Sequence, residues 1–258
     1  MTTFLVTLLC CLTQALPVLA APAAEEILRR TDLIRNPATP FSTQVRISEY
    51  QNARLVDEMV VKVRSKQAPD SGQYRTLVSF TQPLVDRGKL MLRNANEVWF
   101  FDPAARSSVR ISPQQRLLGQ AANGDIMTTN FALDYSVVLI GEEQISDADR
   151  QQRSSWKLLL TSRADSAGLT YSRIDYWVDR DSGGPIMGRF YAASGRLLKQ
   201  AYYRNYQKVL GRLRPTEVII VDAVDRAKVT RMAFGEYRAI EIPEEWLQRG
   251  YLPMFRGN

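Results

Sequence analysis

Paired carboxylates are the first residues whose type and spacing could support chemistry. They occur at Glu142-Glu143, at Asp147 with Asp149, and at Glu244-Glu245. Two carboxylates can divide acid and base roles when a buried cleft pushes their pKa values apart. These pairs fall in sequence typical of turns and in the last part of the chain. A solvated surface is therefore the better interpretation of all three.

A possible cation loop is the second candidate. The segment VDRDSGGP places Asp179 and Asp181 at alternate positions, as a calcium-binding loop does. Such a loop needs oxygen ligands at further fixed positions and a closing glutamate. Gly183 stands where one ligand is required, and no glutamate closes the segment. The pattern predicts a hairpin turn.

The third candidate is a segment that interleaves basic and aromatic residues. Its members are Lys199, Tyr202, Tyr203, Arg204, Tyr206 and Lys208. Sites for single-stranded nucleic acid combine these residue types. The same residues also alternate as a half-exposed strand does. The first twenty residues, described below, predict export, and an exported protein rarely meets nucleic acid. We expect a structural strand and no nucleic-acid partner.

The composition excludes several classes of catalysis. The chain contains no histidine, which removes Ser-His-Asp and Cys-His machinery and His-ligated zinc. Its only cysteines, Cys10 and Cys11, lie in a segment that we expect to be removed, so the mature chain has no thiol. Glycine patterns typical of nucleotide loops and of nucleophile elbows are absent as well. We expect no enzyme, no cofactor and no metal.

The first twenty residues are typical of a secretory signal peptide. An apolar stretch runs over Phe4 to Leu12, and the first charged side chain is Glu25. Val18 and Ala20 suit the small-residue positions of a cleavage site, so we expect cleavage after Ala20 and one domain over residues 21–258. A membrane anchor is the alternative, but polar residues and prolines interrupt the stretch. The net charge of +7 fits solubility or transient contact with an anionic membrane surface.

Short strands dominate the elements that must position these residues. A helix is predicted over Ala23 to Arg35, ended by Asn36-Pro37 and packed on a sheet, and a helical turn over Pro243 to Gln248. The predicted strands are Gln44 to Tyr50, Leu55 to Arg64, Tyr74 to Thr81, Lys89 to Arg93, Val98 to Phe101, Ser107 to Ile111, Val137 to Ile140, Trp156 to Thr161, Thr170 to Val178, Ile186 to Ala192, Leu197 to Lys208, Thr216 to Asp222 and Lys228 to Tyr237. Strands at this spacing indicate an antiparallel meander in a mainly β (α+β) fold.

One long segment, Ser112 to Thr129, lacks a strand pattern. Ser112-Pro113 favours the start of a short helix, in which Leu117 and Leu118 would form an apolar face. That helix could be a mobile cover over an apolar surface, and a plain surface loop is the alternative. Elsewhere apolar residues occupy both faces of Met59 to Val63 and Leu90 to Leu92, so both sides of the sheet must be covered. A packed core and a cavity remain alternatives for one of these sides.

Four stretches resemble a known family. They are AAEEILRRTDLIRNP, LVSFTQPLVDRGKLMLRNANEVWFFDPAARSSVRIS, NGDIMTTNFALDYS and YWVDRDSGGPIMGRFYAASGRLLKQAYYRNYQKVLGRLRPTEVIIVDA. Together they are similar to the LolA-like outer-membrane lipoprotein-sorting proteins of Gram-negative and related bacteria. The resemblance implies an incomplete antiparallel β-barrel (a half-barrel) that encloses or is covered by helices, with a hydrophobic cavity.

The resemblance also implies a function. We expect a periplasmic carrier that holds the acyl chains of a lipid or lipoprotein for transfer toward the outer membrane. An inner-membrane exporter of the resistance-nodulation-division (RND) or ABC type is the expected partner. The alternatives are a sensor that binds lipid or mislocalised protein and signals to a membrane partner, and, less favoured because the strands lack clean lipid-facing alternation, a small outer-membrane barrel.

The residues expected to line the cavity come from the apolar strand faces. They are Val45, Ile47, Met59, Val61, Leu90, Leu92, Trp99, Phe101, Ile174 and Tyr176, with Leu117 and Leu118 as the lid. Family members gate such a lid with an arginine, and the sequence alone assigns that role to no residue here.

Overall fold

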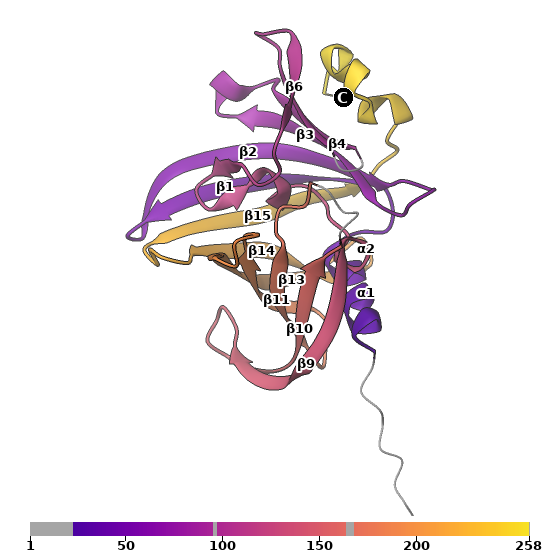
Figure 1. The fold of residues 1–258 in the computed structure, drawn as a ribbon. Helices are drawn as coiled ribbons and strands as arrows, with labels where there is room; N and C mark the ends of the chain where they lie inside the picture. The colour runs from indigo at the N-terminus through magenta and orange to yellow at the C-terminus, as the bar shows by residue number, and fades with distance from the viewer. Residues whose placement is uncertain (1–22, 95–96, 164–167, 258) are drawn as a thin grey trace, which may run out of the picture.

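Thirteen strands form one antiparallel sheet in the computed structural model (Figure 1), which describes residues 23–94, 97–163 and 168–257. The predicted signal peptide lies outside the described residues. None of the described helices has the length and hydrophobicity that a membrane span requires. All thirteen segments predicted as strands belong to this sheet, so the expected mainly β fold is confirmed.

The strands of the large sheet are β1 (Phe41–Gln51), β2 (Arg54–Gln67), β3 (Tyr74–Gln82), β4 (Leu90–Asn94), β5 (Glu97–Asp102), β6 (Ser107–Ile111), β9 (Tyr135–Ser146), β10 (Gln152–Ser162), β11 (Arg173–Asp179), β12 (Pro185–Tyr191), β13 (Leu197–Val209), β14 (Arg212–Asp222) and β15 (Lys228–Ala239). A second, two-stranded sheet pairs β7 (Arg116–Leu118) with β8 (Ala121–Ala122). The helices are α1 (Ala24–Arg35), α2 (Phe131–Asp134) and the 3-10 turns η1 (Leu84–Asp86), η2 (Asn123–Asp125), η3 (Glu244–Leu247) and η4 (Arg249–Met254).

Two meanders make up the sheet where the sequence predicted one. Strands β1 to β6 follow one another in one half, and β9 to β15 follow one another in the other. The halves join where the first strand pairs with the last, with Val45 opposite Phe234 and Ile47 opposite Met232. Strands β6 and β9 are the two edges, so the sheet curls without closing.

Helix α1 packs inside this curl, as predicted. Glu25 and Glu26 lie in its first turn, where the helix dipole favours negative charge. Ile27 and Leu28 are buried against the sheet, and the Thr31 hydroxyl donates to the carbonyl of Gly183 at 2.9 Å. The helix contacts β9, β14 and α2, so it bridges strands that lie far apart in the sheet.

The two faces of the sheet are covered by different parts of the chain. The inner face packs against α1 and the segment between β6 and β9, called here the covering segment (residues 112–134). The outer face of β3 to β5 packs Leu77 and Leu92 against Leu247 and Leu252 of the last turns. The predicted turn over Pro243 to Gln248 is confirmed as η3. Because neighbouring residues of a strand point to opposite faces, these two clusters draw on alternate residues.

The covering segment differs from the sequence prediction. No helix begins at Ser112. Instead the backbone folds back on itself, with Asn123 N donating to Gln115 O at 2.9 Å and Gly124 N to Pro113 O at 2.9 Å. This pairing occupies the backbone groups that a helix would use, and Gly119 turns between β7 and β8 at a φ of 54°. Leu118 is buried in the inner cluster, and Leu117 packs against it.

Candidate functional site: a cavity beneath the covering segment

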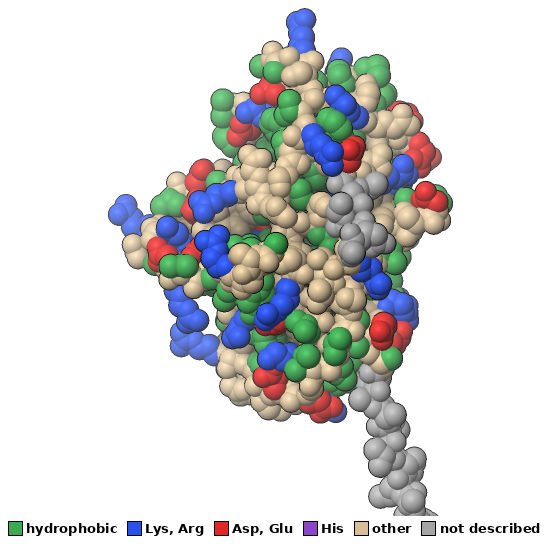
Figure 2. Space-filling view, in the orientation of Figure 1, with side chains coloured by type: hydrophobic (Ala, Val, Ile, Leu, Met, Phe, Trp, Pro, Cys, Tyr) green, Lys and Arg blue, Asp and Glu red, His purple; other side chains and the backbone are tan. Residues whose placement is uncertain are grey.

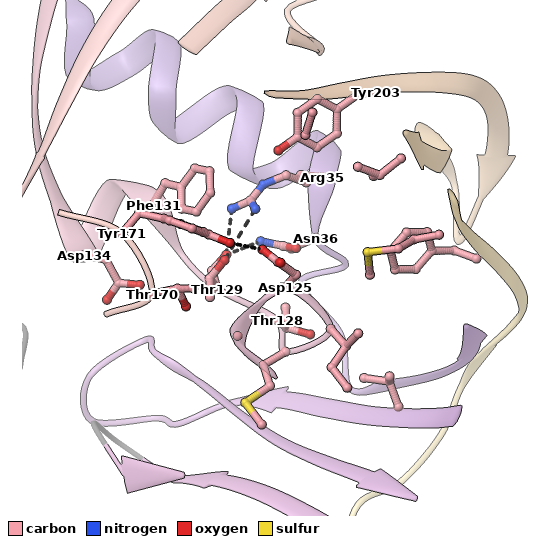
Figure 3. A pocket seen from close by; sticks show the side chains of 18 of the residues that line it. Arg35, Asn36, Asp125, Thr128, Thr129, Phe131, Asp134, Thr170, Tyr171 and Tyr203 are labelled. Carbon is pink, nitrogen blue, oxygen red and sulfur yellow. Dashed lines mark hydrogen bonds between the residues drawn. The ribbon is translucent and has the colours of Figure 1, made fainter. Parts of the chain in front are cut away.

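A cavity of about 130 Å³ lies between the inner face of the sheet and the covering segment (Figure 3). Apolar side chains from both halves of the sheet form much of its wall, including Val63, Phe190 and Met232, and Ile126 and Met127 of the covering segment complete it. Sites for small molecules usually have volumes of about 300–1,000 Å³. The cavity in this conformation is therefore smaller than a typical ligand site.

A buried ion pair at the end of α1 holds the covering segment. Arg35 donates to Asp32 Oδ1 at 2.6 Å and to the carbonyl of Thr129 at 2.8 Å, and its guanidinium lies 3.7 Å from the ring centre of Phe131. Asp32 Oδ2 accepts from the backbone N–H of Ala132 at 2.7 Å. Figure 3 shows Arg35 directed at Thr129 from the helix. One helical turn is thereby tied to three residues of the covering segment, Thr129, Phe131 and Ala132.

Burial and ion pairing shift the pKa values of Asp32 and Arg35 in opposite directions. Burial raises the pKa of the Asp32 carboxyl, and Arg35 opposes that rise. Burial alone would lower the pKa of the Arg35 guanidinium, but the Asp32 carboxylate raises it above its usual value. Each charge therefore depends on the other, and the removal of one would leave the second uncompensated in the interior.

A second buried ion pair closes the other side of the cavity. The Asp125 carboxylate accepts hydrogen bonds from Lys199 Nζ, from Ala122 N at 2.7 Å and from the Tyr171 hydroxyl at 2.8 Å. Lys199 is only 4% exposed. Burial lowers the pKa of its ammonium, and Asp125 opposes this effect. The covering segment is therefore attached to β13 and to the loop before β11 as well as to α1.

Close backbone packing reinforces this second attachment. A Cβ at Gly124 would lie 1.9 Å from Thr170 Oγ1 and 3.1 Å from Thr170 Cβ. Only glycine leaves room for this approach between the covering segment and residue 170. Leu169, Thr170 and Tyr171 line both this cavity and an adjoining open groove. The residues around Asp125 thus lie between the cavity and the adjoining groove.

A third group of polar side chains lies at the rim, where the Asp134 carboxylate accepts from Gln73 Nε2 at 2.8 Å and pairs with Arg93 at 3.7 Å. Burial raises the pKa of Asp134, and Arg93 opposes the rise. Among the described residues, no group of three or more His, Cys, Asp or Glu side chains could hold a metal ion. The polar groups of the site pair with one another, and they leave an apolar space between them.

The structure does not bring the predicted lining residues together. Six of them lie in the inner cluster: Val45, Ile47, Met59, Val61, Ile174 and Tyr176. The other four, Leu90, Leu92, Trp99 and Phe101, belong to the outer cluster beneath the C-terminal turns. Their neighbours Met91, Val98 and Phe100 point inward instead, so these four lie on the face away from this cavity, and their contact with lipid also stays a prediction. Contact of the inner six with lipid stays a prediction, since the cavity is lined by other residues.

Other predicted features fall on the surface or in turns. The carboxylates of Glu142 and Glu244 pair with basic side chains at exposed positions, as expected for solvated acids. The segment VDRDSGGP forms the β11–β12 turn, where Asp179 accepts from the backbone N–H of Ser182 at 2.8 Å. The basic and aromatic segment is strand β13, which was predicted as a half-exposed strand.

Sequence reasoning missed Arg35, Asp125, Tyr171 and Lys199 as parts of the site. A signal existed for Lys199, because it shares its face of the strand with Ala201 and Tyr203, which are both buried. A lysine on an apolar face implies a buried partner. No comparable signal marked Asp125, which lies 74 residues away in the chain.

Comparisons with known proteins agree with this architecture. A family model described as "Uncharacterized protein" matches residues 72–254. A LolA superfamily protein from Nitrosomonas europaea is 32% identical, with a TM-score of 0.78 over 90% of this chain and 100% of that one. The chain belongs to the LolA superfamily. No curated protein matches it.

Two further solved structures share the fold at lower identity. A DUF1329 family protein from Desulfovibrio piger has a TM-score of 0.74 at 18% identity, over 89% of this chain and 97% of that one. A domain from Vibrio parahaemolyticus, named for outer membrane lipoprotein sorting, has a TM-score of 0.73 at 18% identity, over 89% and 98% of the two chains.

Proposed function

We propose that this protein is a periplasmic carrier that holds the acyl chains of a lipid or lipoprotein between the inner face of its sheet and the covering segment. The observation that carries the proposal is the apolar cavity enclosed by that segment. Membership of the LolA superfamily supports it, as does the name of the Vibrio relative. No catalytic step is required, because burial of each methylene contributes about 0.8 kcal/mol.

The small size of the cavity implies that the protein changes conformation when an acyl chain binds. Its volume of about 130 Å³ is well below the roughly 300–1,000 Å³ of a typical ligand site. A long acyl chain needs more space, so the covering segment must move away from the sheet. We assign the gate to the buried pair of Asp32 and Arg35, because it holds Thr129 and Ala132 in place. Movement of these residues would enlarge the cavity along the apolar inner face.

Lipid analysis of the native protein tests the proposal. The chain from residue 21 onward is expressed in the periplasm, purified without detergent, extracted and analysed by mass spectrometry. Acyl lipid in stoichiometric amount is the expected result. A protein that is empty and also fails to bind lipid when challenged would refute the carrier function. An empty protein that captures an inner-membrane protein on crosslinking in cells would favour the sensor alternative over transfer to an exporter.

A matched pair of variants locates the bound lipid. Ala201 is buried and lines the cavity, so Ala201→Leu places extra methyl groups in that space and should reduce the lipid recovered. Ala104 lies in the exposed β5–β6 turn, and Ala104→Leu makes the same chemical change away from the cavity. Equal lipid content in both variants would place the cargo elsewhere.

A further inference from the structure

A basic groove crosses the outer face of the sheet, away from the cavity. Its walls come from β2, β3, the segment after η1, the β5–β6 turn and the end of the chain. Five cationic side chains line it: Lys62, Arg64, Arg87, Arg106 and Arg256. No acidic residue is among its lining residues within the described chain. On the face shown in Figure 2, by contrast, basic and acidic side chains are interspersed.

Four of the five cations of this groove lack an ion pair within the described chain. Among the described residues, Lys62, Arg87, Arg106 and Arg256 form no ion pair. Burial lowers the pKa of the Lys62 ammonium, and so do the positive charges of Arg64 and Arg238, while Glu236 opposes them. Mutual repulsion of this kind is relieved when an anion binds between the cations.

The floor of the groove combines a buried, hydrogen-bonded arginine with apolar side chains. Arg64 is 1% exposed, and it donates to Ser79 Oγ at 3.0 Å and to the carbonyl of Gly257 at 3.3 Å. Its guanidinium lies 5.0 Å from the ring centre of Phe255, so it ties the end of the chain to the sheet. Leu90 and Phe101, both buried, complete the floor. Preorganised sites of this kind lose little conformational entropy when a ligand binds.

We propose that this groove docks the protein on a membrane by binding the phosphate-bearing headgroups of anionic phospholipids. The cationic rim matches the phosphate charge, and the apolar floor matches the first carbons of the acyl chains. The groove holds about 610 Å³, far more than an inorganic phosphate fills. The cavity proposed for cargo lies on the opposite face, so docking leaves the covering segment uncovered.

Vesicle binding tests the inference with the chain from residue 21 onward. Vesicles of phosphatidylcholine alone are compared with vesicles that also contain phosphatidylglycerol, in co-sedimentation at low and at moderate salt. Binding only to the anionic vesicles, weakened by salt, is expected. A variant with Lys62, Arg87, Arg106 and Arg256 changed to Gln should lose about fivefold in affinity for each charge that contacts the surface. Arg64 is left unchanged, because it is buried.

The control variant removes the same charge outside the groove, by changing Arg30, Arg54, Lys208 and Arg226 to Gln. These four side chains are exposed and line none of the grooves described above. The control should bind within about twofold of the unmodified protein, because exposed charges beyond about 10 Å are screened at moderate salt. The single variant Arg87→Gln, at an exposed position, provides a second measurement should the quadruple variant fold poorly.

Three results would overturn the inference. The first is failure to bind anionic vesicles, and the second is equal loss in the groove and control variants. The third is a protein that binds inorganic phosphate in calorimetry but does not bind vesicles. This result would identify a site for a free anion. None of these results depends on whether lipid occupies the cavity, so this inference and the proposed carrier function fail separately.

Discussion

A reversible disulfide between residues 124 and 170 would test whether the covering segment must move before lipid can enter the cavity. A Cβ at residue 124 would lie 3.1 Å from the Cβ of Thr170, and disulfides need about 3.5–4.5 Å between these atoms. The double variant Gly124→Cys/Thr170→Cys therefore needs a shift of less than about 1 Å. It also removes the Thr170 hydroxyl that would clash with a side chain at residue 124. The mature chain has no other cysteine if cleavage follows Ala20.

The stabilisation expected from this disulfide follows from the length of chain between the two cysteines. Residues 124 and 170 enclose a loop of about 46 residues, for which loop-closure entropy gives a stabilisation of about 4 kcal/mol, less any strain. For a protein of this size, that corresponds to a rise in melting temperature of about 10 °C. The gain should appear on oxidation and vanish on reduction, which separates the disulfide from the substitutions themselves.

Lipid exchange is the decisive assay. Transfer of a fluorescent acyl lipid from the protein to vesicles is followed before and after addition of a thiol reductant. The oxidised double variant should exchange at least tenfold more slowly than its reduced form, and Thr170→Cys alone should respond to neither oxidant nor reductant. An oxidised protein that exchanges as fast as the reduced one would show that cargo enters by another route.

Three further predictions concern the buried charges. Lys199→Met should destabilise the protein by about 3–5 kcal/mol because it leaves the Asp125 carboxylate uncompensated, and addition of Asp125→Asn should recover part of that loss in chemical denaturation. Arg35→Met should destabilise by a similar amount and speed amide exchange over residues 126–134 more than over β10; uniform exchange would contradict a local gate. Asp179→Asn should cost about 1–3 kcal/mol at pH 7. Burial opposes the charge of Asp179, but hydrogen bonds from Ser182 and the paired Arg153 together outweigh it and lower its pKa. The stabilisation is therefore present above about pH 4 and is lost as the pH falls through the folded pKa, so the two proteins should converge in acid.

Local patterns predicted the elements of this fold well. The strand segments, helix α1 and the turn at η3 all depend on short-range periodicity and on turn residues. Of the two alternatives for Ser112 to Thr129, the short helix was wrong, because Ser112-Pro113 is a good helix start whose continuation depends on distant partners. Its backbone pairs across the β7–β8 turn, and Leu118 is buried against the inner face. Tertiary packing overrode the local signal.

The faces of the strands were the second point at which sequence reasoning reached its limit. Residues 90–92 and 99–101 are apolar at every position, so alternation could not separate inside from outside. The C-terminal turns cover one face and the covering segment the other, and both covers come from remote parts of the chain. Met91 and Leu92 are both apolar and almost completely buried. Only Met91 belongs to the cluster beneath the covering segment.

The sequence by itself determined the strand-rich architecture, the resemblance to the LolA superfamily, the lack of histidine and the confinement of both cysteines to the first twenty residues. It also indicated export through its first twenty residues, because an apolar stretch of that kind is a local property. Only the tertiary structure decided that β1 pairs with β15 and that Arg35 and Asp125 hold the covering segment over a cavity. The physical reason is distance along the chain: periodicity reports the neighbours of a residue, whereas buried charges are satisfied by partners that only the folded chain brings into contact.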